Sequence, residues 1–551
     1  MPADKKTSTD YRTLRSAATN GGVNSIDNRT LQPAAKRNRE SEQSAPKNLI
    51  NPGLTDLNSE KVTETIQGES ISETPDAARV ENSFPATKIE SNVEIDYADT
   101  QKQRKREKKS VKDRKLLSAD RWLAKRGHTL TYAGIFLFTL TVYFRPYELI
   151  PGLSGLSSMA LIIAIATLLI YLPTQLAAEN SLTIFSTEVK CILFMTVWAV
   201  LTIPIAKSPA LAWETFNDTF SKVVLIFVVM VNTLRTQKRL KGLMWLSIGV
   251  GVLLSYQALN LYRQGIFKTE GYRVNVDFGG MFGNPNDMAL HLVIFTPIAV
   301  ALGFAAKNKL ARLVYLAAAM MMIAGNSVTQ SRGGFLGLLA VGAVLVWKFG
   351  KKQRFKVVLI SAVVGLIFIL VAPGNYGLRI LSIFIPSLDQ VGSSDQRSEL
   401  LKLSLLVTLR NPQGIGIGNF PIVGIRNLDT HNAFTQVSSE LGWLAAFAYI
   451  TLIVSPLRKL AAVERQLFAS SEDDSWIYYL SIGIQASIVG YMVSSFFAPV
   501  AYNWFLYYPI AYAVCLRRIY QIRQAERGIE FTGKKIEQLF PASKSIDEQR
   551  A

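Results

Sequence analysis

Cysteine and histidine are scarce in this chain. Its 551 residues include two cysteines and three histidines. Cys191 and Cys515 both lie within apolar runs, so we expect neither a disulfide bond between them nor a reactive thiol. Chemistry that needs an imidazole has only three positions to use, His128, His291 and His431.

Acidic residues are also outnumbered by basic ones. The chain has 41 Asp and Glu against 60 Lys and Arg, which gives a formal net charge of +19. In a soluble protein this balance would suggest nucleic-acid binding. Here the basic residues gather in short loops between long apolar runs, which is typical of a membrane protein. We therefore expect membrane lipids as partners and no nucleic acid.

Residues 1–127 lack sustained apolar periodicity. They are rich in Ser, Thr, Asn, Lys and Glu, a composition that cannot bury enough surface to offset the entropy of ordering. We predict a disordered tail, and no signal peptide because the first apolar run lies far from Met1. The strongly basic stretch 102–115 fits binding to anionic lipid and marks its side of the membrane as cytoplasmic. A plain solvated tail is the alternative.

Apolar runs long enough to cross a bilayer recur after residue 128. Runs of about 17 to 22 residues predict membrane-spanning helices, because backbone polar groups in lipid must be paired internally. We predict an all-α integral membrane protein with a twelve-span domain at 128–518 and a cytoplasmic tail at 519–551. The spans are expected near 129–146, 157–174, 189–206, 219–234, 242–262, 288–306, 311–328, 334–350, 356–372, 434–455, 476–497 and 502–518.

Charges in the loops predict the orientation. Alternate loops carry the lysines and arginines, which places both termini in the cytoplasm. Only the loop after the second span departs from this pattern, since Lys190 stands there against Glu179 and Glu188. The large loop 373–432 then faces the periplasm, together with the loop 263–287 and the turn around Arg332.

The large loop holds several candidate elements. Tyr376–Leu388, which contains Arg379, reads as an interfacial helix. Asp395–Arg410, which contains Arg397, reads as an amphipathic helix whose apolar side has Leu400, Leu401, Leu403, Leu405, Leu406 and Leu409. The glycines that follow are either a plain tight turn or one whose amides approach a ligand near Gly416.

His431 is the best-placed histidine for chemistry. It stands before the tenth predicted span, at the boundary of water and membrane, and an imidazole pKa near 6.5 suits proton transfer. A helix-capping or buried His is the structural alternative. Asn432 can orient the ring or a substrate hydroxyl. Glu440 follows within the predicted span, where an ionisable group is costly and functional by default, or else is a polar contact between helices.

Arginines on the same side are the second component of a candidate site. Arg332 opens the eighth predicted span beside two glycines, and Arg397, Arg379 and Arg273 lie in loops expected to be exposed. A guanidinium fork matches phosphate oxygens bidentately, so two such forks could hold a pyrophosphate without a metal. A surface charge or a contact to a lipid headgroup is the common role of a single arginine.

The motif Gly283-Asn284-Pro285-Asn286-Asp287 stands at the outer end of the sixth predicted span. Proline suits the first turn of a helix, and Asn or Asp suits its cap. We expect this structural role for Asn284 and Asn286, with a glycan contact as the alternative.

Several of these motifs together resemble the bacterial O-antigen ligase and O-antigen polymerase family. They are Phe282-Gly283-Asn284-Pro285-Asn286, Ser331-Arg332-Gly333-Gly334, Arg397 followed by Asn411-Pro412-Gln413-Gly414-Ile415-Gly416, and His431-Asn432 with Gly442. The likeness covers residues 280–450. The ligase pattern expects Gly, Thr or Tyr where Ala445 stands.

The resemblance implies a GT-C-like glycosyltransferase of the bacterial inner membrane that needs no metal or other cofactor. Its donor would be an undecaprenyl-diphosphate-linked glycan, with His431 as general base and with Arg332, Arg397 and Arg379 on the diphosphate. The acceptor stays open among lipid A core (a ligase), a growing glycan (a polymerase) and a protein hydroxyl (an O-oligosaccharyltransferase). A twelve-span transporter and a membrane scaffold with a recruiting tail are the alternatives from other classes, although transporters usually place ionisable groups near the midplane.

Overall fold

The computed structural model describes residues 122–144, 159–179, 181–276, 282–350, 376–381, 393–469 and 474–539, with isolated positions between 355 and 365. Within these residues the chain is helical, apart from one isolated β-bridge between Thr269 and Arg273. The all-α prediction is confirmed for this part of the chain. Nearly all of the predicted tail 1–127 and of the ninth predicted span, 356–372, lies outside the described residues.

Eight helical segments are long and apolar enough to cross a membrane. They coincide with eight of the predicted spans, because uninterrupted apolar runs of this length have few other stable structures. They are α4 (Met159–Glu179), α5 (Thr187–Thr202) with η3 (Ile203–Ile205), α8 (Gln237–Arg263), α9 (Pro285–Ala305), α10 (Lys309–Val328), α11 (Arg332–Phe349), α17 (Gly442–Ala469) and α18 (Ser475–Ser494) with η8 (Ser495–Phe497).

Three other predicted spans are helical but do not meet the same criteria of length and composition. They correspond to α2 (Trp122–Phe144), to α7 (Ser221–Thr233) and to α19 (Trp504–Leu539). α7 continues a helical run that begins with α6 (Pro209–Thr215) and passes through the π-helical turn η4 (Phe216–Phe220). The count of twelve spans is therefore not established by the structure.

The tenth predicted span is wrong in one respect. Residues 434–455 are not one helix, because α16 (Ala433–Glu440) ends before α17 begins at Gly442. Gly442 has a φ of +77°, and a Cβ at this position would lie 2.2 Å from the carbonyl oxygen of Pro412. A larger residue would meet both strain and a clash there. The candidate membrane span therefore starts at Gly442, and α16 is a separate short helix in front of it.

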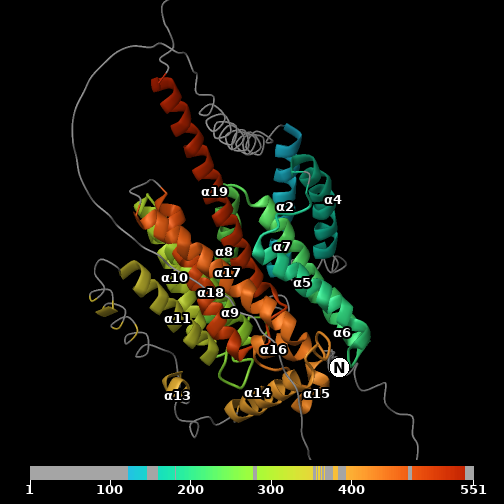
Figure 1. The fold of residues 1–551 in the computed structure, drawn as a ribbon. Coiled ribbons are helices and arrows are strands. Elements are labelled where there is room, and N and C mark those ends of the chain that lie inside the picture. Colours follow the sequence, from blue (N-terminus) through green and yellow to red (C-terminus); the bar gives the residue numbers. More distant parts are fainter. Residues whose placement is uncertain are drawn as a thin grey trace, which may run out of the picture. The chain divides into compact units, whose positions relative to one another are not determined.

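Helix α9 is the centre of the bundle. It packs against α10, α18, α11 and α8 (Figure 1). In its most apolar stretch of 18 residues, 83% of the residues are buried. In α4 and α11 only 28% of the residues in the corresponding stretch are buried, so much of their apolar surface points outward. Outward apolar surface on a helix of this length is what a lipid environment accepts.

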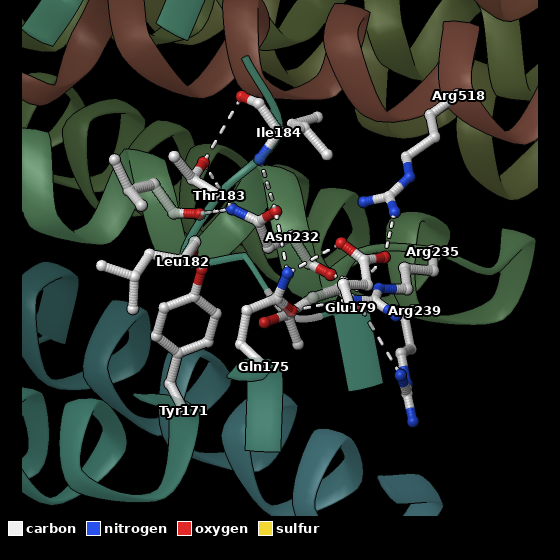
Figure 2. A network of polar contacts seen from close by, with 12 residues as sticks. Tyr171, Gln175, Glu179, Leu182, Thr183, Ile184, Asn232, Arg235, Arg239 and Arg518 are labelled. Atoms are coloured by element: carbon white, nitrogen blue, oxygen red, sulfur yellow. Dashed lines mark hydrogen bonds and ion pairs between the residues drawn. The ribbon is translucent and has the colours of Figure 1, made fainter. Parts of the chain in front are cut away.

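One end of the bundle is held together by buried ion pairs. Glu179, at the end of α4, lies between Arg235 and Arg518, which come from the segment after α7 and from α19 (Figure 2). Arg235 also donates to Gln175 at 2.6 Å, and the Asn232 side chain links this group to Thr183. The network joins three helices that are distant in sequence.

Other buried carboxylates at this end are paired in the same way. Glu188 is 2.8 Å from the Nζ of Lys459, and Glu464 is 2.5 Å from the Nζ of Lys348. Asp474, at the start of α18, accepts from Arg523 at 2.5 Å. The acidic residues that broke the charge pattern of the loop after α4 are thus neutralised by basic residues of other elements.

Candidate active site

The predicted outer loop folds into short helices that lie against one end of the bundle. They are α13 (Tyr376–Leu381), α14 (Ser393–Arg410), α15 (Phe420–Val423) and η7 (Ile425–Asn427), which lead into α16 (Figure 1). The helix predicted at Asp395–Arg410 is confirmed by α14. Its buried residues Leu400 and Val407 pack against Ile415 and Phe420. Three leucines predicted on the apolar side are instead exposed, namely Leu405, Leu406 and Leu409.

The glycine turn after α14 closes around the end of α16. The amide of Ile415 donates to the carbonyl of Ser439 at 3.0 Å, and the amide of Gly416 donates to the carbonyl of Glu440 at 2.9 Å. Gly414 and Gly416 have φ values of +86° and +101°, and a Cβ at Gly414 would lie 2.2 Å from the Glu440 carbonyl oxygen. Glycine is required because two backbones approach this closely.

Glu440 is fixed by the same turn. It is fully buried, and its carboxylate oxygens accept from the amide of Gly418 at 2.9 Å and from the amide of Phe420 at 3.1 Å. Burial raises the pKa of Glu440 from 4.5 to about 8, although the two amide donors act in the opposite direction. These contacts make Glu440 a clamp between α16 and the glycine turn. Burial keeps its carboxyl mostly protonated at neutral pH.

His431 and Asn432 stand at the other end of α16. Asn432 is the N-cap, and its Oδ1 accepts from the amides of Phe434 at 2.9 Å and Thr435 at 3.1 Å. His431 precedes the cap with a φ of +51°, a left-handed conformation that is uncommon outside glycine. Such backbone outliers cluster at functional sites, where the surrounding structure holds them in place.

Arg397 and His431 are brought together by the packing of α14 on α16. Burial lowers the pKa of His431 below its usual value of 6.5, and the positive charge of Arg397 lowers this pKa further. Both side chains are partly exposed. A lowered pKa keeps the imidazole neutral at pH 7, which is the form that accepts a proton.

A second cluster surrounds the start of α11. Ser331 is the N-cap of this helix, and its hydroxyl donates to Asn286 Oδ1 at 2.9 Å. Arg273 donates to the same oxygen at 2.8 Å and to the carbonyl of Thr329 at 3.0 Å. The expectation that Arg273 is exposed is wrong, since its side chain is 3% exposed. The guanidinium thus pairs with the carbonyl of Thr329, the C-cap residue of α10.

Arg332 is the first residue of α11 and lies near Arg273, where its charge lowers the pKa of the buried guanidinium. Gly334, two residues later, packs closely against α9, since a Cβ there would lie 2.8 Å from the Cβ of Ala289. Asn284 caps α9 by accepting from the amide of Asn286 at 2.9 Å, as the sequence predicted.

Both clusters lie at the same end of the bundle. The end of α18 contacts the second cluster, because Ser494 donates to the carbonyl of Gly333 at 3.0 Å. The segment after α18 contacts the first, because the amide of Ala501 donates to Oε1 of Gln436 at 3.1 Å. Helix α13 is also close, since the ring centres of Tyr376 and Phe335 are 6.2 Å apart. Arg379 belongs to α13, but only its backbone is described.

The segment that contains most of these residues matches a family model described as O-antigen ligase, over residues 316–450. This segment resembles the O-antigen ligase family. The predicted resemblance is thereby confirmed, and it indicates a membrane glycosyltransferase of the ligase or polymerase type. No curated protein matches the chain.

The O-antigen ligase domain includes Arg332, Arg397, His431, Asn432 and Glu440, and therefore both clusters in part. Arg273, Asn284 and Asn286 precede the matched residues, yet they hold the start of α11 from outside. Within the described residues, no group of three or more His, Cys, Asp or Glu side chains is placed to hold a metal ion.

Two residues near the candidate site of the O-antigen ligase domain were missed by sequence reasoning. Burial raises the pKa of Asp429, and its charge acts on Glu440. Tyr502 comes from the segment before α19 and also lies beside Glu440. The position of Asp429, two residues before His431, is a signal that the sequence does contain. Tyr502 has no such signal, because only the folded chain brings it there.

Proposed function

We propose that this protein transfers a glycan from an undecaprenyl-diphosphate-linked donor to an acceptor hydroxyl at the end of the bundle where α11 and α16 begin. The observation that carries the proposal is the placement of Arg397 beside a partly exposed, neutral His431 within the O-antigen ligase domain. A cation beside a neutral base suits a reaction in which an anionic leaving group departs while a hydroxyl loses its proton.

In this proposal the His431 imidazole accepts the proton of the acceptor hydroxyl. The acceptor oxygen then bonds to the anomeric carbon, and the bond from that carbon to the diphosphate oxygen breaks. Undecaprenyl diphosphate leaves with the electron pair. Arg397 and Arg332, with Arg379 as a further candidate, bind the diphosphate oxygens and stabilise their growing charge. General base action of this kind contributes about 10² to 10⁴ in rate.

The remaining candidate residues act through position. Asn432 fixes the turn that presents His431, and Glu440 and Gly416 hold the far end of α16. Arg273 and Asn286 fix the first turn of α11, which carries Arg332. We assign these residues to positioning, because each is held by contacts within the protein, although the Nδ2 of Asn432 has no hydrogen-bond partner among the described residues.

The membrane orientation is part of the proposal. Basic loops at the opposite end place both termini in the cytoplasm of a bacterial cell and the candidate site at the periplasmic face of the inner membrane. A membrane-impermeant maleimide tests this assignment. It should label an Asn427→Cys variant in intact spheroplasts but label Lys238→Cys only after lysis, since both positions are exposed. Labelling in the reverse order would overturn the orientation.

The surface glycans of a deletion strain test the function. Lipid-linked polymer that stays unligated indicates a ligase, and single repeats on lipid A core indicate a polymerase. Unchanged lipopolysaccharide with altered protein glycosylation indicates an O-oligosaccharyltransferase. Complementation with wild-type protein should restore the pattern, whereas His431→Ala should not. Glycans that are unchanged on deletion, with uptake or export lost in vesicles, would replace the enzyme by a transporter.

A further inference from the structure

A cavity lies at the end of the bundle opposite the candidate active site. It has a volume of about 320 Å³ and is lined by the first turns of α8, α10 and α18 and the last turn of α9. The candidate active site contacts the other ends of α9, α10 and α18. Helices of about 20 residues separate the two ends by about 30 Å, so the cavity is a separate site.

The charge of this cavity is one-sided. Among the described residues that line it are Lys241 and Lys307, and none of them is a carboxylate. Neither lysine forms an ion pair within the described part of the chain, in contrast to Lys348 and Lys459 at the same end. Two cations without a matching carboxylate favour an anionic ligand.

Trp476 also lines the cavity. Its side chain is 7% exposed, yet its Nε1–H has no hydrogen-bond partner among the described residues. The Nζ of Lys241 stands 5.2 Å from the centre of this ring, and the Arg523 guanidinium stands 5.1 Å from it. An unpaired buried N–H donor is costly, and an acceptor oxygen supplied by a ligand would remove that cost.

The other wall of the cavity is apolar and continues onto the outer surface of the bundle. Leu302, Ala311 and Tyr315 line the cavity. Between Ala311 and Tyr315 in the sequence of α10, Leu313 is 65% exposed and Val314 is 47% exposed on the outer surface. Tyr315 accepts from the indole of Trp245 at 2.6 Å, which forms an aromatic pair of the kind that gathers at membrane interfaces.

We propose that this cavity binds the phosphate headgroup of an anionic phospholipid. The lysines and the Trp476 N–H bind the phosphate oxygens, while the acyl chains run along the exposed apolar face of α10. A free phosphate could make the same contacts with the lysines, but it has no apolar part to contact the apolar wall. We therefore assign the site to a lipid.

Native mass spectrometry of the full-length protein in detergent tests the proposal, with phosphatidylglycerol and phosphatidylcholine titrated separately. Lys241→Gln combined with Lys307→Gln should weaken phosphatidylglycerol binding by about tenfold or more, because each lysine near an anionic surface contributes about 1 kcal/mol. Phosphatidylcholine binding should not change. Lys307→Gln alone alters an exposed side chain and should give part of the loss in a protein that folds normally.

The matched control removes the same charge outside the cavity. Lys238→Gln combined with Lys309→Gln changes two exposed lysines at the same end, and it should leave the selectivity for phosphatidylglycerol intact. An equal loss in this control would overturn the proposal in favour of general surface charge. Displacement of the lipid by an excess of inorganic phosphate, with equal affinity, would overturn the assignment to a lipid. Unchanged binding in the cavity variant would overturn the site itself.

Discussion

Buried carboxylates have different partners at the two ends of the helical bundle. At the end shown in Figure 2, Glu179 meets two arginines, one of them at 3.1 Å, and Glu188 meets Lys459 at 2.8 Å. At the other end, the Glu440 carboxyl is held by the backbone amides of Gly418 and Phe420. The positive charge of Arg397 at this end acts instead on His431, whose pKa it lowers together with burial.

This difference separates stability from function. A buried carboxylate paired with arginine locks helices together and leaves no charge for a ligand. Arginines that are directed to a site, with the local acid satisfied by amides, remain able to meet an anionic substrate. Changes at the ion-paired end should therefore reduce the amount of folded protein, whereas changes at the other end should reduce transfer.

The largest effect is expected from His431→Ala. Loss of the base should lower the rate of glycan transfer by about 10² to 10⁴, while the amount of inserted protein stays at the wild-type level. Surface glycan on gels and quantitative blotting measure the two quantities. Asn427→Ala is the control, because it truncates an exposed residue of η7 that, like His431, has a positive φ. Full-length glycan made by His431→Ala would remove the base assignment.

Glu179→Ala should act on stability. It leaves Arg235 and Arg518 buried without their carboxylate, which costs about 3–5 kcal/mol when a buried pair is broken. The melting temperature of the purified protein should fall, and the transfer rate per folded molecule should not. Asp218→Ala, which breaks the exposed pair with Lys222, should cost about 0–1 kcal/mol. Equal melting temperatures for the two variants would contradict the claim that the buried ion pairs of Glu179 stabilise the fold.

Arg397→Lys should weaken donor binding, because an ammonium group cannot grip a diphosphate bidentately. We expect a loss of about ten- to a hundredfold in affinity for a lipid-diphosphate analogue, measured by isothermal titration. Arg410→Lys on the same helix is exposed and should bind as the wild type does. Unchanged affinity in Arg397→Lys would take this residue out of the diphosphate site.

The pH dependence of transfer should report on the pairing of Arg397 with His431. The base works as neutral imidazole, and its pKa in the folded protein is lowered, so the rate should fall only as the pH drops below 6.5. In Arg397→Gln the nearby positive charge is gone, and the acid limb should move to higher pH. The residual transfer rate of this variant, measured at saturating donor over a range of pH values, gives the position of the acid limb. An unmoved acid limb would mean that the two groups do not interact.

Glu440→Gln should produce the smallest change. The pKa of this carboxyl is raised to about 8, so its contribution to stability is fully present below about 4.5 and is lost as the pH rises through 8. Wild-type stability should decrease by about 1 kcal/mol between pH 7 and pH 9 from this group, and the variant should lack that decrease. Thermal unfolding at several pH values measures it. A parallel pH profile in both proteins would contradict the raised pKa.

The membrane helices could be predicted because long apolar runs carry a strong and local signal. The break before Gly442 could not, because residues 433–440 extend the run of α17 and only the contact with Pro412 requires the turn. The burial of Arg273 was hidden for a similar reason. Its partners Thr329 and Asn286 are 56 and 13 residues away, and a charged loop residue by itself reads as exposed.

Glu440 shows the same limit within the candidate site. An acid next to an apolar run predicted a functional group, and the family resemblance did not distinguish chemistry from support. Its partners are amides of the glycine turn, which reads from sequence as an ordinary loop. The sequence did indicate Arg397 and His431 as candidate site residues, and the fold brings the two close enough for the charge of Arg397 to act on the pKa of His431.

The eight residues of α16 act as a fixed spacer. One end carries His431 and the Asn432 cap, and the other is clamped by the turn at Gly416 immediately before the candidate membrane span. At about 1.5 Å and about 100° per residue, the helix sets both the height of the imidazole above that span and the direction from which it faces the donor. Adding or deleting a single residue would move the base by less than 2 Å but turn it by more than a quarter of a revolution. The length of this short helix is therefore as much a part of the site as the residues at its ends.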